Sequence, residues 1–366
     1  MNKERKALLL SVGYGRGHHS AAKALADELT RRCWCTRVAD VCATSHPRLF
    51  RLTQLFYLFC VRRAPRLWGS LYKWLGTADW PSLISQPVLQ GCLEELRTEL
   101  EQEAPDLVIC TYPLFAFMLD YLAREEGILI PYAVVVTDAL SISRPWVLSQ
   151  APLICLPDEL SLASVQQEFD LPAERLVATG FPVRAAFSPG VRDIPGAEGK
   201  GLHIVYAAHA TPARVRADVQ AMLKEWPHMQ LSIVAEERKG LLLDLLHLAP
   251  GVQLYAADQD MAALLRTAHI YVGKAGAASV FEAYSAEVPV LVNYALPGQE
   301  QGNLQLLERD KAGQYVENTD ALLQALRRLL QDSAAGWREA CAAMRRAGRS
   351  GGASRIADAL ERRFFS

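Results

Sequence analysis

The chain has 366 residues, 51% of them hydrophobic, which is enough for two domains of ordinary size that each bury a core. Its charges sum to −1, which excludes the strongly basic character of a general nucleic-acid-binding protein. The eight cysteines are scattered, and the spacing of Cys33 and Cys35 suits neither a zinc site nor a redox pair, so we expect reduced thiols in a cytosolic protein. Apolar runs fall short of the roughly 18 residues that cross a bilayer, and the first one stops at Gly13, too early for a signal segment.

The first predicted strand, residues 7–12, leads into a glycine-rich turn and then into His18 and His19 at the start of a helix. Such a turn is typical of a dinucleotide-binding fold, and Asp40 at the end of the next strand favours that alternative. The spacing is GxGxGHH rather than GxGxxG, however, and a histidine beside a pyrophosphate has to act as a donor or a base. Taken alone, a His near a helix start such as His18 is more often a capping or surface residue.

Residues 48–75 are rich in cations and aromatic rings and contain no acidic residue. Apolar residues recur there at helical spacing, and a basic amphipathic segment in a neutral protein indicates contact with a membrane surface. Each cation near an anionic leaflet contributes about 1 kcal/mol. The alternative is a core-packed helix with solvated arginines. The cations are Arg48, Arg51, Arg62, Arg63, Arg66 and Lys73, and Trp68 is among the aromatic residues.

The rest of the first half alternates strands and helices. A helix is predicted at residues 92–102 and strands at 105–110, 131–136, 153–156 and 176–179. The strand at 131–136 ends in Thr137 and Asp138. Residues 188–201 are rich in Pro and Gly and mixed in charge, so we place an interdomain linker there.

The second half repeats the alternation, with strands predicted at residues 202–206, 231–234, 252–255, 270–272 and 289–292, and with helix at 331–365. Residues 274–279 are too small to pack a core, and such a loop lets a ligand approach the backbone N–H groups at a helix start. Ser279 is a suitable N-cap, with Glu282 three residues later as in a capping box. The alternative is that this segment belongs to an ordinary βαβ unit that binds no ligand.

This pattern predicts an α/β protein of two doubly wound, Rossmann-like domains. We expect residues 1–187 to form the first domain, joined by a C-terminal helix at about 340–366, and residues 202–339 to form the second. Polar residues 299–303 follow the strand at 289–292, at the sheet edge where open α/β sheets bind ligands.

Several motifs resemble those of family 28 glycosyltransferases, above all the monogalactosyldiacylglycerol synthases and the processive diacylglycerol glucosyltransferases. They are the turn at 15–22, the Thr137-Asp138 pair followed by Trp146, the exit at 180–184 and the stretch 274–303, with His209 in a further loop. The chain departs from the family pattern where Ala replaces Gly or Pro at positions 207, 210, 275 and 277, and where Ser143 or Arg144 replaces a His.

The resemblance implies the GT-B architecture, with the two domains facing across a cleft. It implies inverting transfer of a hexose from UDP-glucose or UDP-galactose to diacylglycerol or a related membrane lipid. No cofactor and no metal are expected, since we recognise no Asp-x-Asp pair of the kind that holds a nucleotide-bound cation. The protein would be cytoplasmic and peripheral on the inner face of the cell membrane. Two alternatives stay open: an isoprenoid or soluble acceptor, and a nucleotide-sugar-binding protein without turnover.

The resemblance also assigns roles to individual residues. His18 would be the general base, oriented or polarised by Asp138, whereas His19 has no motif support. Glu282 would hold the ribose of the nucleotide. The remaining donor residues would be Gly17, Arg184, His209, Lys274, Gly276, Ala277, Ser279, Gln299, Glu300 and Asn303. The acceptor and membrane side would use Arg62, Arg63, Arg66, Trp68 and Trp146.

Overall fold

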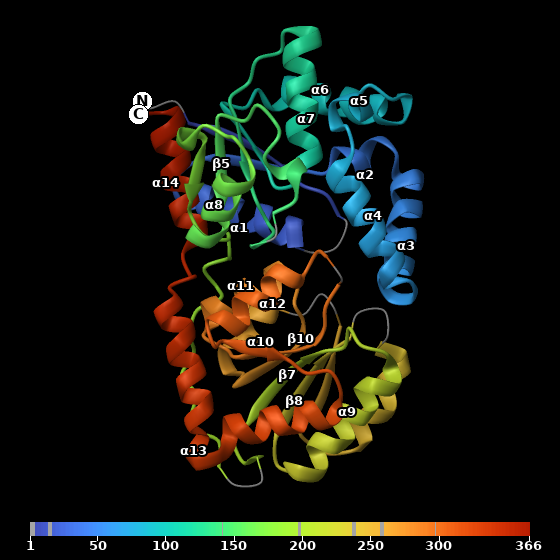
Figure 1. Cartoon of the computed structure of the whole chain (residues 1–366), viewed down its shortest axis with the longest axis vertical. Coiled ribbons are helices and arrows are strands. Elements are labelled where there is room, and N and C mark those ends of the chain that lie inside the picture. The colour runs from blue at the N-terminus through green and yellow to red at the C-terminus, as the bar shows by residue number, and fades with distance from the viewer. Residues whose placement is uncertain are drawn as a thin grey trace. The chain divides into compact units, whose positions relative to one another are not determined.

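The computed structural model describes residues 4–13, 17–140, 142–196, 199–235, 239–256, 260–296 and 298–366. The chain forms two compact units (Figure 1). The first comprises residues 1–185, 296–302 and 350–366, and the second comprises 186–295 and 303–349. Each is built on a parallel sheet, so the predicted pair of doubly wound α/β domains is confirmed. The linker predicted at residues 188–201 falls at the start of the second unit.

The sheet of the first unit has the strand order β2-β1-β3-β4-β5-β6. Its strands are β1 (Lys6–Leu10), β2 (Cys35–Ala39), β3 (Leu107–Cys110), β4 (Tyr132–Val135), β5 (Leu153–Leu156) and β6 (Leu176–Ala178). The central strands β3, β4 and β5 are buried at every position, because helices cover both faces of the sheet. Strand order reverses between β1 and β3, and an open α/β sheet binds ligands at such a point.

The helices of the first unit surround this sheet (Figure 1). They are α1 (Gly17–Arg31), α2 (Val41–Ser45), α3 (Pro47–Arg63), α4 (Pro65–Thr77), α5 (Trp80–Ile84), α6 (Pro87–Glu103), α7 (Pro113–Glu126), α8 (Glu159–Glu168) and α14 (Gly352–Phe364), with 3₁₀ turns η1 (Arg144–Trp146) and η2 (Ala173–Arg175).

The sheet of the second unit has the order β12-β11-β10-β7-β8-β9 and reverses between β7 and β10. Its strands are β7 (His203–Ala207), β8 (Gln230–Val234), β9 (Val252–Tyr255), β10 (Ile270–Lys274), β11 (Val290–Tyr294) and β12 (Gly313–Tyr315). Its helices are α9 (Pro212–Glu225), α10 (Met261–Thr267), α11 (Ala277–Ala286), α12 (Gln301–Arg309) and α13 (Thr319–Ala347), with the 3₁₀ helix η4 (Lys239–His247).

Two predicted helices have different limits in the structure. The basic segment 48–75 forms two helices rather than one, since Pro65 lacks an N–H and begins a new helix after Ala64. The predicted helix at 331–365 is two helices, because α13 ends at Gly348 in the left-handed conformation and α14 starts after Gly351. Residues 331–334 of α13 have non-helical φ/ψ and divide it into two helical parts. The first part precedes the predicted stretch and is capped by Asn318, which accepts from the Ala321 N–H.

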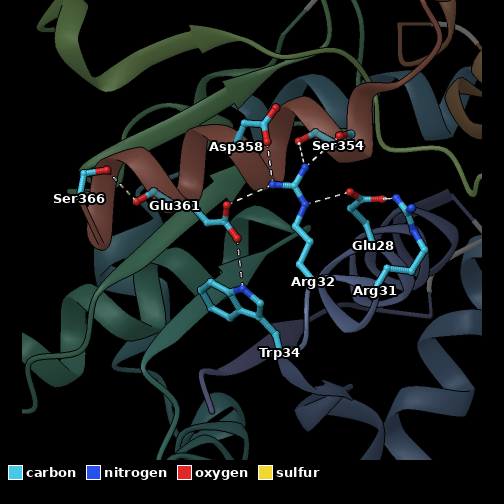
Figure 2. A network of polar contacts seen from close by, with 8 residues as sticks. All are labelled: Glu28, Arg31, Arg32, Trp34, Ser354, Asp358, Glu361 and Ser366. Atoms are coloured by element: carbon cyan, nitrogen blue, oxygen red, sulfur yellow. Dashed lines mark hydrogen bonds and ion pairs between the residues drawn. The ribbon is translucent and has the colours of Figure 1, made fainter. Parts of the chain in front are cut away.

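A charge network around Arg32 helps to hold the last helix, α14, in the first unit (Figure 2). Arg32, just after α1, donates from Nη1 to Asp358 (2.6 Å) and to Glu361 (3.1 Å). Its Nη2 donates to Ser354 Oγ (2.9 Å), and its Nε donates to Glu28 (3.0 Å). The side chain of Arg32 is 22% exposed, whereas those of Asp358 and Glu361 are 45% and 33% exposed, so the network is only partly shielded from water. α14 therefore depends on a charge network as well as on its apolar side.

Replacing this arginine should loosen α14. Arg32→Met keeps the aliphatic stem but removes hydrogen bonds to charged partners, which are worth about 1.5–3 kcal/mol each. Since the partners regain some hydration, we expect a net loss of about 2–3 kcal/mol and roughly 30- to 150-fold faster amide exchange in α14. Arg362→Met, an exposed arginine of the same helix, is the matched control. Equal exchange rates in the two variants would contradict the role given to Arg32.

Candidate active site

His18 lies in the first turn of α1, at the carboxyl end of β1. Its Nδ1 is 2.7 Å from the hydroxyl oxygen of Thr137, which follows β4. Its ring meets Tyr112 edge-on at a centroid distance of 5.1 Å, and the hydroxyl of Thr111 donates to its backbone carbonyl (3.3 Å). Residues that follow β3 and β4 thus hold this imidazole, which itself follows β1, at the point where strand order reverses.

The surroundings of His18 favour the neutral ring. Burial lowers the pKa of His18 to about 4, and a hydrogen bond with the Thr111 backbone opposes this only in part. When Nδ1 carries the proton and donates to Thr137, the lone pair of Nε2 is available to take a proton from a substrate. A neutral imidazole with one nitrogen fixed is the arrangement required of a general base.

The described hydrogen bonds of Asp138 join it to two aromatic residues rather than to the imidazole of His18. Its Oδ2 accepts from Nε1 of Trp146 (2.8 Å) and from the hydroxyl of Tyr72 (3.4 Å). Asp138 is 7% exposed, and burial raises its pKa to about 6. Trp146 is buried too, with its ring 6.0 Å from that of His18. Asp138 was predicted to orient or polarise His18, whereas the residue within hydrogen-bond distance of Nδ1 is its neighbour Thr137, which the sequence indicated only as part of a motif.

In the second unit, a short loop joins β10 to α11 (Figure 1). The N-cap of α11 is Gly276, which has no side chain to cap the first backbone N–H groups, so the positive end of the helix is suited to an anion. The predicted N-cap, Ser279, was wrong: the helix begins at Ala277, because Ala is a strong helix former. Neither Ala275 nor Ala277 has a positive φ, so these replacements cause no backbone strain.

Two buried predicted donor residues are hydrogen-bonded to loop backbone. Nδ2 of Asn303 donates to the carbonyl of Ala275 (2.9 Å), and Asn303 is only 2% exposed. Oε2 of Glu300 accepts from the N–H of Leu296 (3.0 Å), four residues earlier, and Glu300 is only 4% exposed. Both side chains therefore shape loops, and their contact with a sugar stays a prediction.

The other predicted donor residues lie at the ends of strands. Lys274 ends β10, and His209 lies two residues beyond β7, the neighbouring strand. Glu282 projects from the second turn of α11 and is half-buried. These three thus belong to the edge where the order of the second sheet reverses.

The remaining three donor residues lie in the first unit. Gly17 is the first residue of α1, and half-buried Arg184 follows β6. Gln299 belongs to the stretch 296–302, which groups with the same unit, and its Oε1 accepts from Nε1 of Trp68 (3.1 Å). None of these placements tests a role toward the donor, which stays a prediction for all three.

The exposed side of α3 and α4 is apolar and basic. Five apolar side chains of α3 are 41–63% exposed: Leu49, Leu52, Leu55, Phe56 and Phe59. Exposed cations lie among and beside them, namely Arg48, Arg51, Arg63, Arg66 and Lys73, and Leu67 and Trp74 are half exposed on α4. We call these residues the α3–α4 face. The side chain of Arg62 lies outside the described part of the chain. Exposed apolar side chains that recur along one helix are typical of an interaction surface, and a membrane role for this face stays a prediction.

The metal prediction needs one correction. An Asp-x-Asp sequence does occur, at residues 258–260. Asp260 is the N-cap of α10 and accepts from the N–H of Ala262 (3.1 Å), whereas Asp258 lies outside the described residues. Within the described ranges, no cluster of three or more His, Cys, Asp or Glu is placed to hold a metal ion. Over the same residues, no helix has the length and apolar character to span a membrane.

Solved structures share this architecture across the whole chain. The glycotransferase of kitacinnamycin superposes with a TM-score of 0.65 at 17% identity, covering 99% of this chain and 100% of its own. The calicheamicin glycosyltransferase gives a TM-score of 0.62 at 16% identity, covering 99% and 98%. The fold is therefore that of the GT-B glycosyltransferases.

Sequence comparisons are more specific. A model of monogalactosyldiacylglycerol (MGDG) synthase matches residues 18–183, and a model of the glycosyltransferase family 28 C-terminal domain matches residues 232–360. A processive diacylglycerol beta-glucosyltransferase of Bacillus cereus (strain B4264) is 27% identical over 344 residues, covering 91% of this chain and 87% of its own. One of Bacillus mycoides (strain KBAB4) is 26% identical over 346 residues, covering 91% and 87%. The two models match different parts of the chain, and the predicted resemblance to the family 28 glycosyltransferases is confirmed.

Proposed function

We propose that this glycosyltransferase moves glucose or galactose from a UDP-sugar to a hydroxyl of diacylglycerol or a related membrane lipid. The observation that carries the proposal is the pairing, in one unit, of a desolvated neutral His18 with the exposed basic and apolar α3–α4 face. His18 supplies a base that can take the proton of a hydroxyl, and the α3–α4 face is suited to contact with a surface of anionic lipid. The family-model matches and the names of the Bacillus relatives support the same acceptor class.

The chemistry is a single displacement. Nε2 of His18 takes the proton of the acceptor hydroxyl, whose oxygen forms a bond to the anomeric carbon of the sugar. The bond from that carbon to the diphosphate breaks, and UDP leaves with the electron pair. Lys274 and the N-terminus of α11 would receive the developing negative charge. One displacement inverts the anomeric carbon, and since these groups supply the positive charge, we expect full activity in excess EDTA.

For binding of the UDP-sugar, we predict that Glu282 accepts hydrogen bonds from the ribose hydroxyls of UDP. A bond to an ionised group is worth about 1.5–3 kcal/mol. Glu282→Ala should therefore weaken UDP binding by about ten- to a hundredfold while α11 stays intact, since Ala favours helix. Calorimetric titration with UDP measures this. Glu308→Ala, an exposed carboxylate of α12, serves as the control, and unchanged affinity in Glu282→Ala would remove that residue from the site.

The pKa values near His18 predict the pH dependence of turnover. Asp138, with a pKa of about 6, takes up a proton as the pH falls through 6 and loses its charge-assisted bonds to Trp146 and Tyr72. His18 stays neutral until about pH 4. Between pH 5 and 8 we expect one step, a fall in turnover below about pH 6, and Asp138→Asn should abolish it. A step that persists in Asp138→Asn would mean that His18 titrates near its ordinary pKa.

The proposal is tested by incubating the purified protein with labelled UDP-glucose or UDP-galactose and one acceptor at a time. The acceptors are diacylglycerol in anionic vesicles, an isoprenoid phosphate, and a soluble sugar. We expect label in the glycolipid fraction with diacylglycerol only. Transfer to another acceptor would replace the lipid assignment. UDP binding without any transfer would identify a nucleotide-sugar-binding protein without turnover.

On this proposal the protein works at the inner face of the cell membrane, where the acceptor lies in the bilayer. The α3–α4 face carries five described cations, each worth about 1 kcal/mol near an anionic leaflet. Even if half of them are screened, the attraction together with the apolar side chains supports reversible, peripheral attachment.

A further inference from the structure

The end of β1 is held from both sides by residues that no motif includes. Oδ2 of Asp40 accepts from the backbone N–H of Gly13 (2.8 Å), and Nε2 of Gln54 donates to the backbone carbonyl of Gly13 (2.8 Å). The approach is close: a Cβ at Gly13 would lie 3.1 Å from Gln54 Nε2 and 3.5 Å from a ring atom of Phe50. Both polar groups of this glycine are therefore paired, one to the N-cap of α2 and one to α3.

Gly13 lies in the connection from β1 to α1, whose residues 14–16 are outside the described part of the chain, and His18 follows in the first turn of α1. The opposite side of the imidazole is fixed by Thr137. A shift of Gly13 would therefore move the chain that leads into His18 while its partner on β4 stays in place. Because proton transfer depends on sub-ångström placement, such a shift would reduce turnover without affecting donor binding.

Gln54 comes from the helix that carries most of the exposed apolar surface. Leu52, Leu55, Phe56 and Phe59 lie on the outer side of α3, each at least half exposed. Gln54 is half-buried on the other side of the same helix, as a period of 3.6 residues requires. α4 makes a second link of this kind, because the hydroxyl of Tyr72 donates to Asp138 (3.4 Å).

We propose that Gln54 is a positioning residue: through the carbonyl of Gly13 it fixes the start of the connection that presents His18. It thereby ties the catalytic base to α3, the helix that meets lipid if the proposed function holds. Lipid that contacts the outer side of α3 then restricts the motion of His18 as well, because Gln54 on the inner side of the same helix holds the carbonyl of Gly13. The lipid part rests on the proposed function, whereas the positioning part follows from the contacts of Gly13 alone.

The test uses Gln54→Met, which keeps the length of the side chain and removes its N–H donor. Gln102→Met, an exposed glutamine of α6, is the matched control. We expect Gln54→Met to lower kcat about tenfold or more while donor KM, UDP affinity and vesicle binding stay within twofold of the parent. A purely structural glutamine would lower the unfolding temperature and leave kcat intact below it. A kcat within twofold of the parent overturns the proposal.

Hydrogen exchange separates this inference from the proposed function, because it needs no substrate. The amide of Gly13 should exchange at least about tenfold faster in Gln54→Met than in the parent and in Gln102→Met; equal rates overturn the positioning role. Adding phosphatidylglycerol vesicles should slow exchange at Gly13 in the parent and leave it unchanged in Gln54→Met. If vesicles affect both proteins equally, the link to lipid is wrong. If the parent glycosylates no lipid, the proposed function fails, while the exchange rates still decide the role of Gln54.

Discussion

His18→Ala should lower turnover by about 10²–10⁴, the usual contribution of a positioned general base. The substitution removes Nε2, the group on the described side chains best prepared to take a proton, because burial holds the ring neutral and Thr137 fixes Nδ1. The helix itself should persist, since Ala favours helix. Steady-state transfer from labelled UDP-sugar to lipid measures the loss, and calorimetry should find UDP affinity unchanged.

The control for this experiment is the neighbouring histidine. His19 is exposed on the same turn of α1, so His19→Ala removes an imidazole of the same helix without touching the proposed base. We expect its turnover to stay within twofold of the parent. If His18→Ala retains more than half of the parental turnover, another group takes the proton, and the assignment of His18 is wrong.

Reversing Arg62, Arg63 and Arg66 to Glu should abolish both sedimentation with anionic vesicles and transfer to lipid. The change alters six charge units at the junction of α3 and α4, each worth about 1 kcal/mol near an anionic leaflet. Even at half efficiency, membrane partitioning falls by more than about a hundredfold. Binding of the parent should weaken as salt rises, because salt screens exposed charges. UDP affinity should be unaffected in every case.

Arg362 and Arg363, exposed on α14 in the same unit, provide the matched charge reversal away from the α3–α4 face. Their replacement by Glu should leave sedimentation within a few-fold of the parent. If both variants lose vesicle binding alike, net charge rather than this face controls attachment. If the first variant still sediments like the parent, the acceptor is reached by another surface.

Much of the fold could be predicted because buried parallel strands are short, continuous apolar runs. Residues 153–156 and 252–255 were predicted with the limits that the structure shows for β5 and β9. Helix limits were less predictable, because local capping decides them. A Pro splits the basic segment after Ala64, and a Gly rather than Ser279 begins α11.

The contacts of the site could not be predicted because they join residues far apart in sequence. His18 and Thr137 are 119 positions apart, and Tyr72 and Asp138 are 66 positions apart. Sequence motifs indicated that Thr137 and Asp138 were important, but only the twist and register of β4 show that the threonine faces the imidazole and the aspartate faces Trp146. Gln54 carried no signal at all, since its partner is a backbone carbonyl.

The anomeric configuration of the lipid product tests the central claim most directly. UDP-glucose and UDP-galactose carry an α-linked sugar, and one displacement assisted by His18 yields a β-glycoside. The proton spectrum of the purified glycolipid reports the configuration through the coupling of the anomeric proton. We expect a β-hexosyl diacylglycerol as the product. An α-linked product, or UDP-sugar that is bound and hydrolysed while diacylglycerol stays unmodified, would contradict the account.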